Sequence, residues 1–269
     1  MKPVFIMPAP SKLLLYDELP FWSAPFGILL LDTARFRKGM LALDIGCGAG
    51  FPMLELAGRL DTDGHVTGLD PSAEAVEMVN EKIRARAVIN ASVTMGKGEA
   101  MPFGDAHFDL VTSNNGLNNV EDQEKVLSEC FRVCKPGAQL VLTMNLPHTM
   151  IEFYDALRYV LEDMEMLDEI RAMEEHISDK RKPADYLSDL ILASGFRIRS
   201  IQVDGFRYRF ASAGAFFSHY MIRNFFKPPW LEFLPIEKRG EIFARVEKLL
   251  DKGPVEMSIP FVCFDCFKS

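Results

Sequence analysis

The sequence predicts an α/β protein with a doubly wound, mostly parallel sheet. Short apolar runs alternate with amphipathic helical stretches along the chain, and strands joined through helices in this way lie parallel. The first apolar run ends in a turn that carries three glycines at alternate positions, which is typical of a strand passing tightly into a helix. Seven strands are predicted, over residues 40–44, 65–70, 92–96, 108–113, 139–144, 196–204 and 255–267.

The glycine-rich turn is the most informative motif. Asp44 ends the first strand, and Gly46, Gly48 and Gly50 follow it. Glycines at these positions let main-chain N–H groups approach a ligand at the start of the next helix. A dinucleotide fingerprint, G-x-G-x-x-G, would require a third glycine or alanine where this chain has Phe51, which disfavours a nicotinamide-dependent oxidoreductase.

An acid two residues before three alternate glycines resembles the first motif of the class I S-adenosylmethionine-dependent methyltransferases. The resemblance extends over about residues 40–145 and implies a Rossmann-like doubly wound fold with an antiparallel last strand. It implies S-adenosyl-L-methionine as the cofactor, with the glycine turn around its methionine half. Asp70 ends the second strand, where a carboxylate can accept hydrogen bonds from both ribose hydroxyls.

The segment that begins at Lys97 resembles the part of the family that contacts the adenine. The family usually has an acid or a small polar residue where Lys97 stands, so Gly98 and Glu99 are expected to supply the contacts. The predicted cofactor-binding residues are Asp44, Gly46, Cys47, Gly48, Gly50, Asp70, Pro71, Gly98, Glu99, Ala100, Asn114 and Asn115. Two of them have structural alternatives: Asp70 as an acid near a helix N-terminus, and Glu99 as a solvated loop charge.

Composition and charge limit the class of protein. The chain has 269 residues, 48% of them hydrophobic, and no apolar run reaches the roughly eighteen residues of a membrane span. The first twelve residues lack the apolar core of a signal peptide, so we expect a cytoplasmic protein. The formal net charge of -8 disfavours a nucleic-acid partner, because binding to phosphates needs a basic face.

The five cysteines do not predict a metal site. Cys130 and Cys134 share one face of a predicted helix, whereas Cys263 and Cys266 lie on opposite faces of a predicted strand. Buried, reduced thiols are therefore expected, and Cys47 is expected to fill space inside the glycine turn.

We predict an N-terminal helical cap at 1–38, with helix breaks at Pro20 and Pro25, followed by a methyltransferase domain at 39–269. Two insertions, at about 147–194 and 205–253, interrupt this domain; the first contains a long helix over 151–177, and the second is rich in aromatic residues. If they cover the carboxyl edge of the sheet, they form a lid above an apolar pocket. The arrangement resembles small-molecule methyltransferases of ubiquinone and menaquinone biosynthesis and favours a small apolar or aromatic methyl acceptor. The sequence does not indicate the oligomeric state.

The implied chemistry is an in-line attack by a nucleophilic atom on the sulfonium methyl, which leaves S-adenosylhomocysteine. A base is needed only if the nucleophile must lose a proton. His148, just after the fifth strand, is the candidate catalytic base, with a loop histidine as the structural alternative; His219 is a second candidate. Asn118 and Asn119 could orient the acceptor.

The sequence also bears on two further classes of protein. After the fourth strand the chain lacks the proline pair and the aromatic residue of enzymes that methylate DNA bases or glutamine amides, which makes those acceptors unlikely. A protein of the same fold that binds S-adenosylmethionine without methyl transfer, in a regulatory or partner-binding role, would keep the same cofactor motifs and stays open as the alternative.

Overall fold

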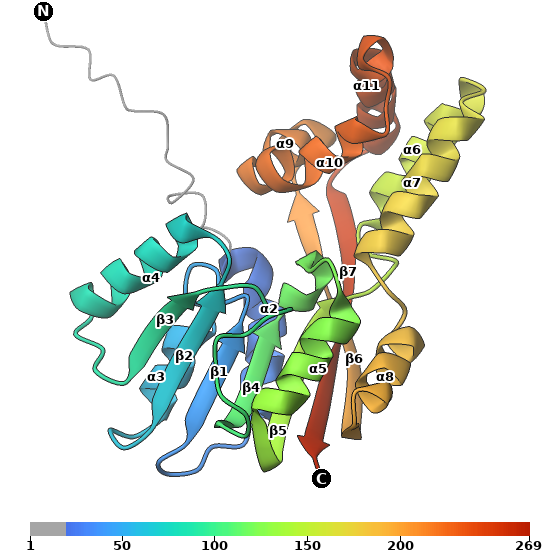
Figure 1. The fold of residues 1–269 in the computed structure, drawn as a ribbon. Coiled ribbons are helices and arrows are strands. Elements are labelled where there is room, and N and C mark those ends of the chain that lie inside the picture. The colour runs from blue at the N-terminus through green and yellow to red at the C-terminus, as the bar shows by residue number, and fades with distance from the viewer. Residues whose placement is uncertain (1–19) are drawn as a thin grey trace, which may run out of the picture. The chain divides into compact units, whose positions relative to one another are not determined.

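The computed structural model describes residues 20–269, which fold into two compact units (Figure 1). The first unit contains the described residues up to Met144, with Leu187–Gln202 and Cys263–Ser269. The second unit contains Asn145–Tyr186 and Val203–Val262. The predicted cap is described only from residue 20 onward, where the helix α2 (Pro20–Thr33) includes Pro25 within its length.

The sheet has seven strands in the order β3-β2-β1-β4-β5-β7-β6. Strands β1 to β5 all run parallel to their neighbours among these five, and β7 runs in the opposite direction (Figure 1). The predicted fold class is therefore confirmed. The strands are β1 (Leu41–Ile45), β2 (His65–Asp70), β3 (Ala91–Met95), β4 (Phe108–Asn114), β5 (Cys134–Asn145), β6 (Phe196–Phe210) and β7 (Val255–Lys268).

Helices of the first unit pack on this sheet. Besides α2, they are α3 (Met53–Arg59), α4 (Ala73–Ala85), α5 (Gln123–Val133) and most of α8 (Ala184–Ala193). Two of them begin at side-chain caps: Ser72 accepts a hydrogen bond from the Ala75 backbone N–H, and Asp122 from that of Lys125. Contacts join α2 to β4, α3 to β2, and α4 to β2 and β3.

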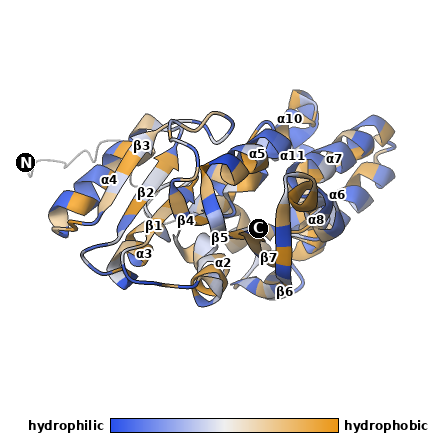
Figure 2. Ribbon diagram, turned by 60° about the horizontal axis from the view of Figure 1, so that its bottom comes forward, coloured by the Kyte–Doolittle hydropathy of each residue, from blue (hydrophilic) through white to orange (hydrophobic). Residues whose placement is uncertain are grey.

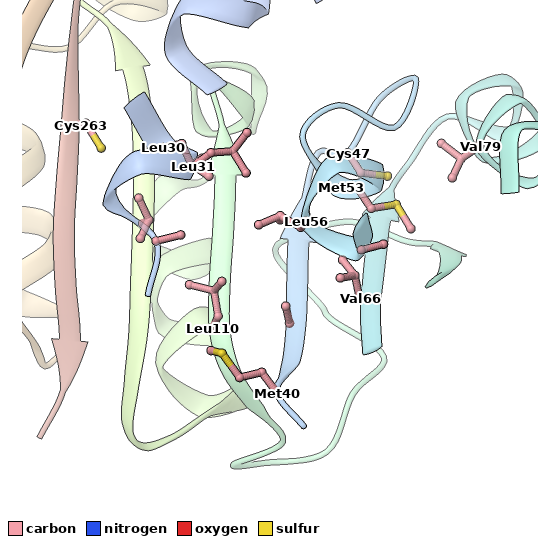
Figure 3. Close-up of a cluster of buried hydrophobic side chains, with 14 residues drawn as sticks. Leu30, Leu31, Met40, Cys47, Met53, Leu56, Val66, Val79, Leu110 and Cys263 are labelled. Atoms are coloured by element: carbon pink, nitrogen blue, oxygen red, sulfur yellow. The ribbon is translucent and has the colours of Figure 1, made fainter. Parts of the chain in front are cut away.

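The core of the first unit lies between these helices and the central strands. Leu30 from α2, Leu56 from α3 and Leu110 from β4 are fully buried in one cluster (Figure 3). The central strands are mostly hydrophobic, whereas α4 carries many hydrophilic residues on its exposed side (Figure 2). A helix and strand pattern of this kind buries one face of each element and leaves the other to solvent.

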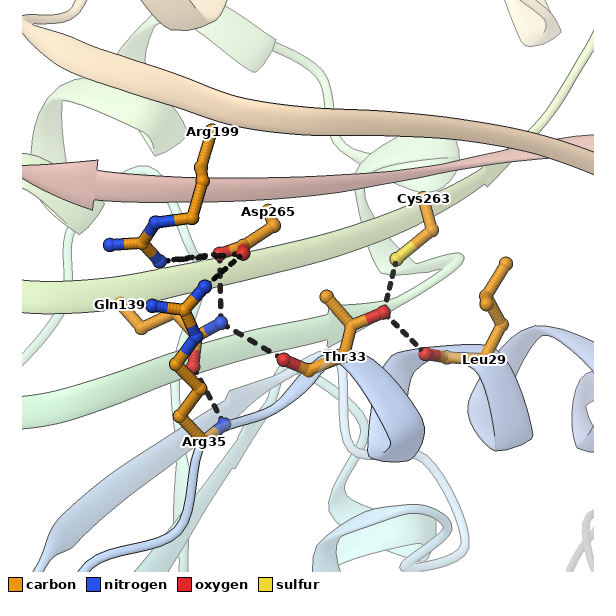
Figure 4. A network of polar contacts seen from close by, with 7 residues as sticks. All are labelled: Leu29, Thr33, Arg35, Gln139, Arg199, Cys263 and Asp265. Atoms are coloured by element: carbon orange, nitrogen blue, oxygen red, sulfur yellow. Dashed lines mark hydrogen bonds and ion pairs between the residues drawn. The ribbon is translucent and has the colours of Figure 1, made fainter.

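A polar network fixes the end of α2 to the later strands (Figure 4). Asp265 on β7 is buried, and its carboxylate accepts hydrogen bonds from Arg35, Arg199 and the Gln139 side chain. Gln139 also donates to the backbone oxygen of Thr33, at 3.1 Å. The network therefore satisfies a buried carboxylate with donors from three different parts of the first unit.

Two predicted strand boundaries were wrong. β5 begins at Cys134 instead of residue 139, and Gly137, with φ of 78°, lies inside the strand. The register between β4 and β5 shifts at this point, so an irregularity in the pairing takes up Pro136 and Gly137. β6 also continues to Phe210 instead of ending at residue 204.

The second unit is helical apart from its parts of β6 and β7. Its helices are α6 (Ile151–Asp163), α7 (Leu167–Lys180), α9 (Ala213–Ser218), α10 (Lys227–Glu232) and α11 (Arg239–Leu250). The predicted single helix over 151–177 is two helices, because the chain turns at Glu165 with a φ of 55°. The two segments of this unit overlap the predicted insertions, except that most of α8 belongs to the first unit.

Aromatic side chains form the core of the second unit. Phe153 stacks on Trp230 with 3.8 Å between ring centroids, and Phe216 packs beside Trp230. All three side chains are buried. Phe216 and Trp230, which belong to the aromatic-rich insertion, are therefore core residues of their own unit.

The cysteines are all buried and none is in a disulfide. Burial raises the pKa of the Cys134 thiol to about 12 and that of Cys263 to about 11, so these thiols are protonated at neutral pH. Over residues 20–269, no group of three or more potential metal ligands was found. In the same range, no helix combines the length and the apolar character that a bilayer crossing requires.

Candidate functional site

The glycine-rich turn is held against the end of β2 by main-chain hydrogen bonds. The N–H groups of Gly46 and Cys47 both donate to the backbone oxygen of Leu69, at 2.8 and 3.2 Å. Gly46, Gly48 and Gly50 all have positive φ values, of 68°, 50° and 98°. Residues other than glycine rarely adopt this backbone conformation, so the turn requires the glycines that the sequence provides.

The space around the turn differs from one glycine to the next. A Cβ atom at Gly46 would lie 3.2 Å from the Cα of Gly116, whereas a Cβ at Gly48 would meet no atom within 4 Å. The turn is thus packed against the protein at Gly46 and open at Gly48. The Cys47 side chain points into the core, where it is 1% exposed, so only its backbone could contact a ligand.

Asp44 lies at the base of the turn and is almost fully buried. Its Oδ1 accepts a hydrogen bond of 2.7 Å from the Thr112 hydroxyl, while its Oδ2 has no hydrogen-bond partner among residues 20–269. Burial raises the pKa of this carboxyl from 3.8 to about 7, with a smaller upward contribution from the charge of Asp70. The Thr112 hydroxyl and the Met53 backbone N–H act in the opposite direction.

A buried carboxylate oxygen without a donor is costly unless a ligand supplies one. Oδ2 of Asp44 could accept hydrogen bonds from the ammonium group at the methionine end of S-adenosylmethionine. The free acceptor oxygen at the base of the turn therefore fits the cofactor that the sequence predicted. Sequence reasoning missed Thr112, because nothing in the sequence distinguishes its hydroxyl from the other polar side chains of β4.

Asp70 connects the end of β2 to the glycine turn. Its Oδ2 accepts the N–H of Gly48 and its Oδ1 accepts the N–H of Ser72, both at 2.9 Å. A carboxylate has about four acceptor positions, so two remain for the ribose hydroxyls. The bond to Ser72 shows that Asp70 also orders the start of α4, which was the structural alternative for this residue; Pro71 beside it is exposed.

The segment 97–100 takes a compact turn after β3. Gly98 is buried, and a Cβ atom there would lie 3.2 Å from the Val126 side chain. Lys97 forms an ion pair with Glu121, and Glu99 accepts the Glu121 backbone N–H at 3.0 Å. Ala100 donates its backbone N–H to the Lys97 carbonyl.

The two asparagines after β4 have different roles in the structure. The Asn114 side chain is buried; it accepts a hydrogen bond from the Thr143 hydroxyl and donates to the backbone oxygen of Ser23 on α2. Asn115 has a left-handed backbone, with φ of 61°, and its N–H donates to the Thr143 carbonyl. Asn114 therefore fixes α2 to the end of β4.

Helix α2 makes a second close contact near the turn. A Cβ atom at Gly27 would lie 2.3 Å from the ring of Phe51, so the helix can approach only because residue 27 is glycine. This explains why a large aromatic residue occupies the position that argued against a dinucleotide site. Nothing in the sequence indicated this pairing, because a contact between residues 24 positions apart leaves no local pattern.

The structure brings Asp44, the glycine turn and Asp70 together, with Asn114 on the neighbouring strand. The predicted base, His148, belongs to the second unit, where its side chain is exposed and its backbone oxygen accepts the Ile151 N–H. His219 lies in the same unit among aromatic rings, with its own ring 5.8 Å from that of Tyr208. Catalytic roles for these histidines stay predictions.

Residues 43–142 match the family model described as a methyltransferase domain. This match supports the predicted resemblance to S-adenosylmethionine-dependent methyltransferases over this part of the chain. The chain is similar to demethylmenaquinone methyltransferases, at 37% identity for the protein of Listeria welshimeri and 34% for that of Anoxybacillus flavithermus. Each match extends over 135 residues, which are 49% of this chain and 57% of the relative, so the chain spans little more than half the length of the curated relatives it matches.

Solved structures share the fold of the methyltransferase domain. The YcgJ protein of Bacillus subtilis superposes with a TM-score of 0.61 at 17% identity, over 91% of this chain and 98% of that one. A SAM-dependent methyltransferase from Aquifex aeolicus superposes with a TM-score of 0.55 at 16% identity, over 97% and 99% of the two chains. The predicted resemblance to S-adenosylmethionine-dependent methyltransferases is confirmed, and S-adenosylmethionine is the cofactor of such domains.

Proposed function

We propose that this protein transfers a methyl group from S-adenosylmethionine to a small, apolar or aromatic acceptor. The observation that carries the proposal is the arrangement of Asp44 and Asp70 around the glycine turn within a methyltransferase domain. The names of the curated relatives, demethylmenaquinone methyltransferases, support an acceptor of the quinone class.

In this proposal, Asp44 and the glycine turn hold the methionine end of the cofactor, and Asp70 holds the ribose. Gly98, Glu99 and Ala100 contact the adenine side, while Asn114 keeps α2 and β4 in place beside the turn. The bound cofactor supplies an activated methyl group on a good leaving group. The protein then contributes mainly by orienting the acceptor and excluding water.

A proton acceptor is required only when the acceptor atom carries a proton that must leave. The exposed imidazole of His148 is the candidate for this step, because histidine titrates near neutral pH. Replacement of His148 with Gln should lower the rate of methyl transfer without changing cofactor affinity. Equal loss of both would instead indicate a structural role.

The first test is calorimetric titration of the chain with S-adenosylmethionine, S-adenosylhomocysteine and NAD. We expect binding of the first two and none of NAD. Asp70→Ala should weaken cofactor binding by about 1.5–3 kcal/mol, which is roughly tenfold to 150-fold, because hydrogen bonds to a charged group are lost. Asp63→Ala is the matched control: this acid precedes β2, its side chain is 67% exposed, and it forms a surface ion pair with Lys38. Unchanged affinity in Asp70→Ala would show that the ribose assignment is wrong.

The alternative is a protein that binds S-adenosylmethionine without transferring its methyl group. One structural neighbour, at a TM-score of 0.56 and 17% identity, is described as the [4+2]-cyclase SpnF, so this fold also occurs in a protein named for other chemistry. A screen of reduced quinones and phenols with radiolabelled cofactor separates the two. Labelled product supports methyl transfer, and cofactor binding without product from any acceptor favours the alternative.

A further inference from the structure

The second unit contains a buried arginine for which residues 20–269 provide no acidic partner. Arg181 follows α7 and is only 4% exposed. Buried arginines are normally paired with a carboxylate, because a guanidinium removed from water needs both countercharge and acceptors. Within residues 20–269, no Asp or Glu lies within ion-pair distance of Arg181, although surface arginines of the same unit, such as Arg158 and Arg245, have such partners.

The Arg181 guanidinium makes its side-chain hydrogen bond through Nη1. Nη1 donates to the Tyr154 hydroxyl at 3.0 Å, and the guanidinium carbon lies 5.3 Å from the centre of the same ring. Nε is buried and has no hydrogen-bond partner among the described residues. In an arginine, Nε and Nη2 point to the same side, and together they match the two oxygens of a carboxylate.

The Tyr154 hydroxyl adds a further donor. It accepts hydrogen bonds both from Arg181 and from the indole N–H of Trp230, at 2.9 Å. With two donors directed at its oxygen, the hydroxyl proton must point elsewhere, and no acceptor for it occurs among the hydrogen bonds of the described residues. Donors therefore outnumber acceptors around this buried cation.

Local structure compensates for only part of the charge. Arg181 is the C-cap of α7, and its backbone N–H donates to the Ile177 carbonyl at 3.0 Å. The negative end of the helix dipole favours a cation at this position. It provides no acceptor for Nε, so the unsatisfied donor remains.

Aromatic rings lie near the Tyr154 side chain that contacts Arg181. The His176 ring lies 6.5 Å from the Tyr154 ring and 5.5 Å from that of Phe233. Burial is the main cause that lowers the pKa of His176 to about 4; the charges of Arg181 and Lys180 act in the same direction, and that of Asp179 opposes them. At pH 7 this imidazole is therefore neutral.

We propose that the second unit binds the carboxylate of a small aromatic acid, with the two carboxylate oxygens on Nε and Nη2 of Arg181 and the Tyr154 hydroxyl as an additional donor. The missing countercharge and the unsatisfied donors call for an oxyanion, and the surrounding rings favour an aromatic body next to it. The site lies wholly within the second unit. It does not depend on the proposed methyl transfer.

The test is calorimetric titration of the full chain with benzoate and, separately, with inorganic phosphate. We expect saturable benzoate binding that falls by about tenfold or more in Arg181→Lys, which keeps the charge and loses the two-pronged geometry. Arg158→Lys is the matched control, since this exposed arginine on α6 already pairs with Glu174, and benzoate affinity should not change there. No benzoate binding to the wild-type chain, or equal affinity in Arg181→Lys, would overturn the proposal, and binding of phosphate alone would overturn the carboxylate assignment.

If Arg181→Lys does not fold, Tyr154→Phe decides the question. This variant keeps the guanidinium and the ring and removes one donor. A drop in benzoate affinity of about threefold or more supports the site, whereas unchanged affinity contradicts it.

Discussion

Replacement of Asp44 with Asn should make the protein more stable at alkaline pH and should remove one pH dependence of its stability. The pKa of this carboxyl is about 7 in the folded protein against 3.8 for an unperturbed group, chiefly because the folded protein buries it. A group whose pKa is raised on folding contributes its full stability below the unfolded pKa, and this contribution is lost as the pH rises through the folded pKa. The loss for Asp44 thus falls between about pH 4 and pH 7.

The size of the effect follows from the shift. A change of about three pKa units corresponds to about 4 kcal/mol of unfolding free energy above pH 7. Linkage places about 2.5 kcal/mol of this loss between pH 5 and pH 8. Asn keeps the shape of the side chain and has no charge to bury, so this part of the loss should be absent in Asp44→Asn.

The assay is urea unfolding of the wild-type chain and of Asp44→Asn at several pH values from 5 to 8, without cofactor. The stability of the variant relative to wild type should rise by about 2.5 kcal/mol over this range, because all other titrating groups cancel in the difference. Asp63→Asn, at an exposed acid, should show no such trend. A constant difference between wild type and Asp44→Asn would refute the assignment of a raised pKa to this buried carboxyl.

Three other substitutions test the packing around the site. Thr112→Val removes a hydrogen bond that lowers the pKa of Asp44, so the pH series should show the stability loss moved to higher pH. Gly27→Ala should lower the free energy of unfolding by about 1–2 kcal/mol, because the clash with Phe51 exceeds the gain in helix propensity. Adding Phe51→Leu to this variant should restore the lost stability. Additive effects of the two substitutions would contradict the clash. Asp265→Asn should cost about 1.5–3 kcal/mol in denaturant unfolding, because two arginines lose their shared carboxylate, and wild-type stability would argue against the network.

Much of the first unit could be predicted because its signals are local. Each parallel strand is a short apolar run between turn residues, and the amphipathic helices alternate with these strands in sequence. The positive φ values of the turn follow directly from the glycines at 46, 48 and 50. The predicted ends of strands were less accurate where pairing with a neighbouring strand determines them. The start of β5 is an example, because a register shift against β4 accommodates Gly137 within the strand.

The sequence by itself determined where the strands lie along the chain, the glycine turn, and the acids Asp44 and Asp70. These features resemble those of a methyltransferase domain. The tertiary structure decided the properties that depend on distant neighbours. Burial beneath the turn sets the protonation of Asp44, the approach of α2 pairs Gly27 with Phe51, and the helical packing of the second unit buries Arg181. Backbone conformation follows from the residue itself and its near neighbours, whereas desolvation and packing depend on residues brought together only by folding.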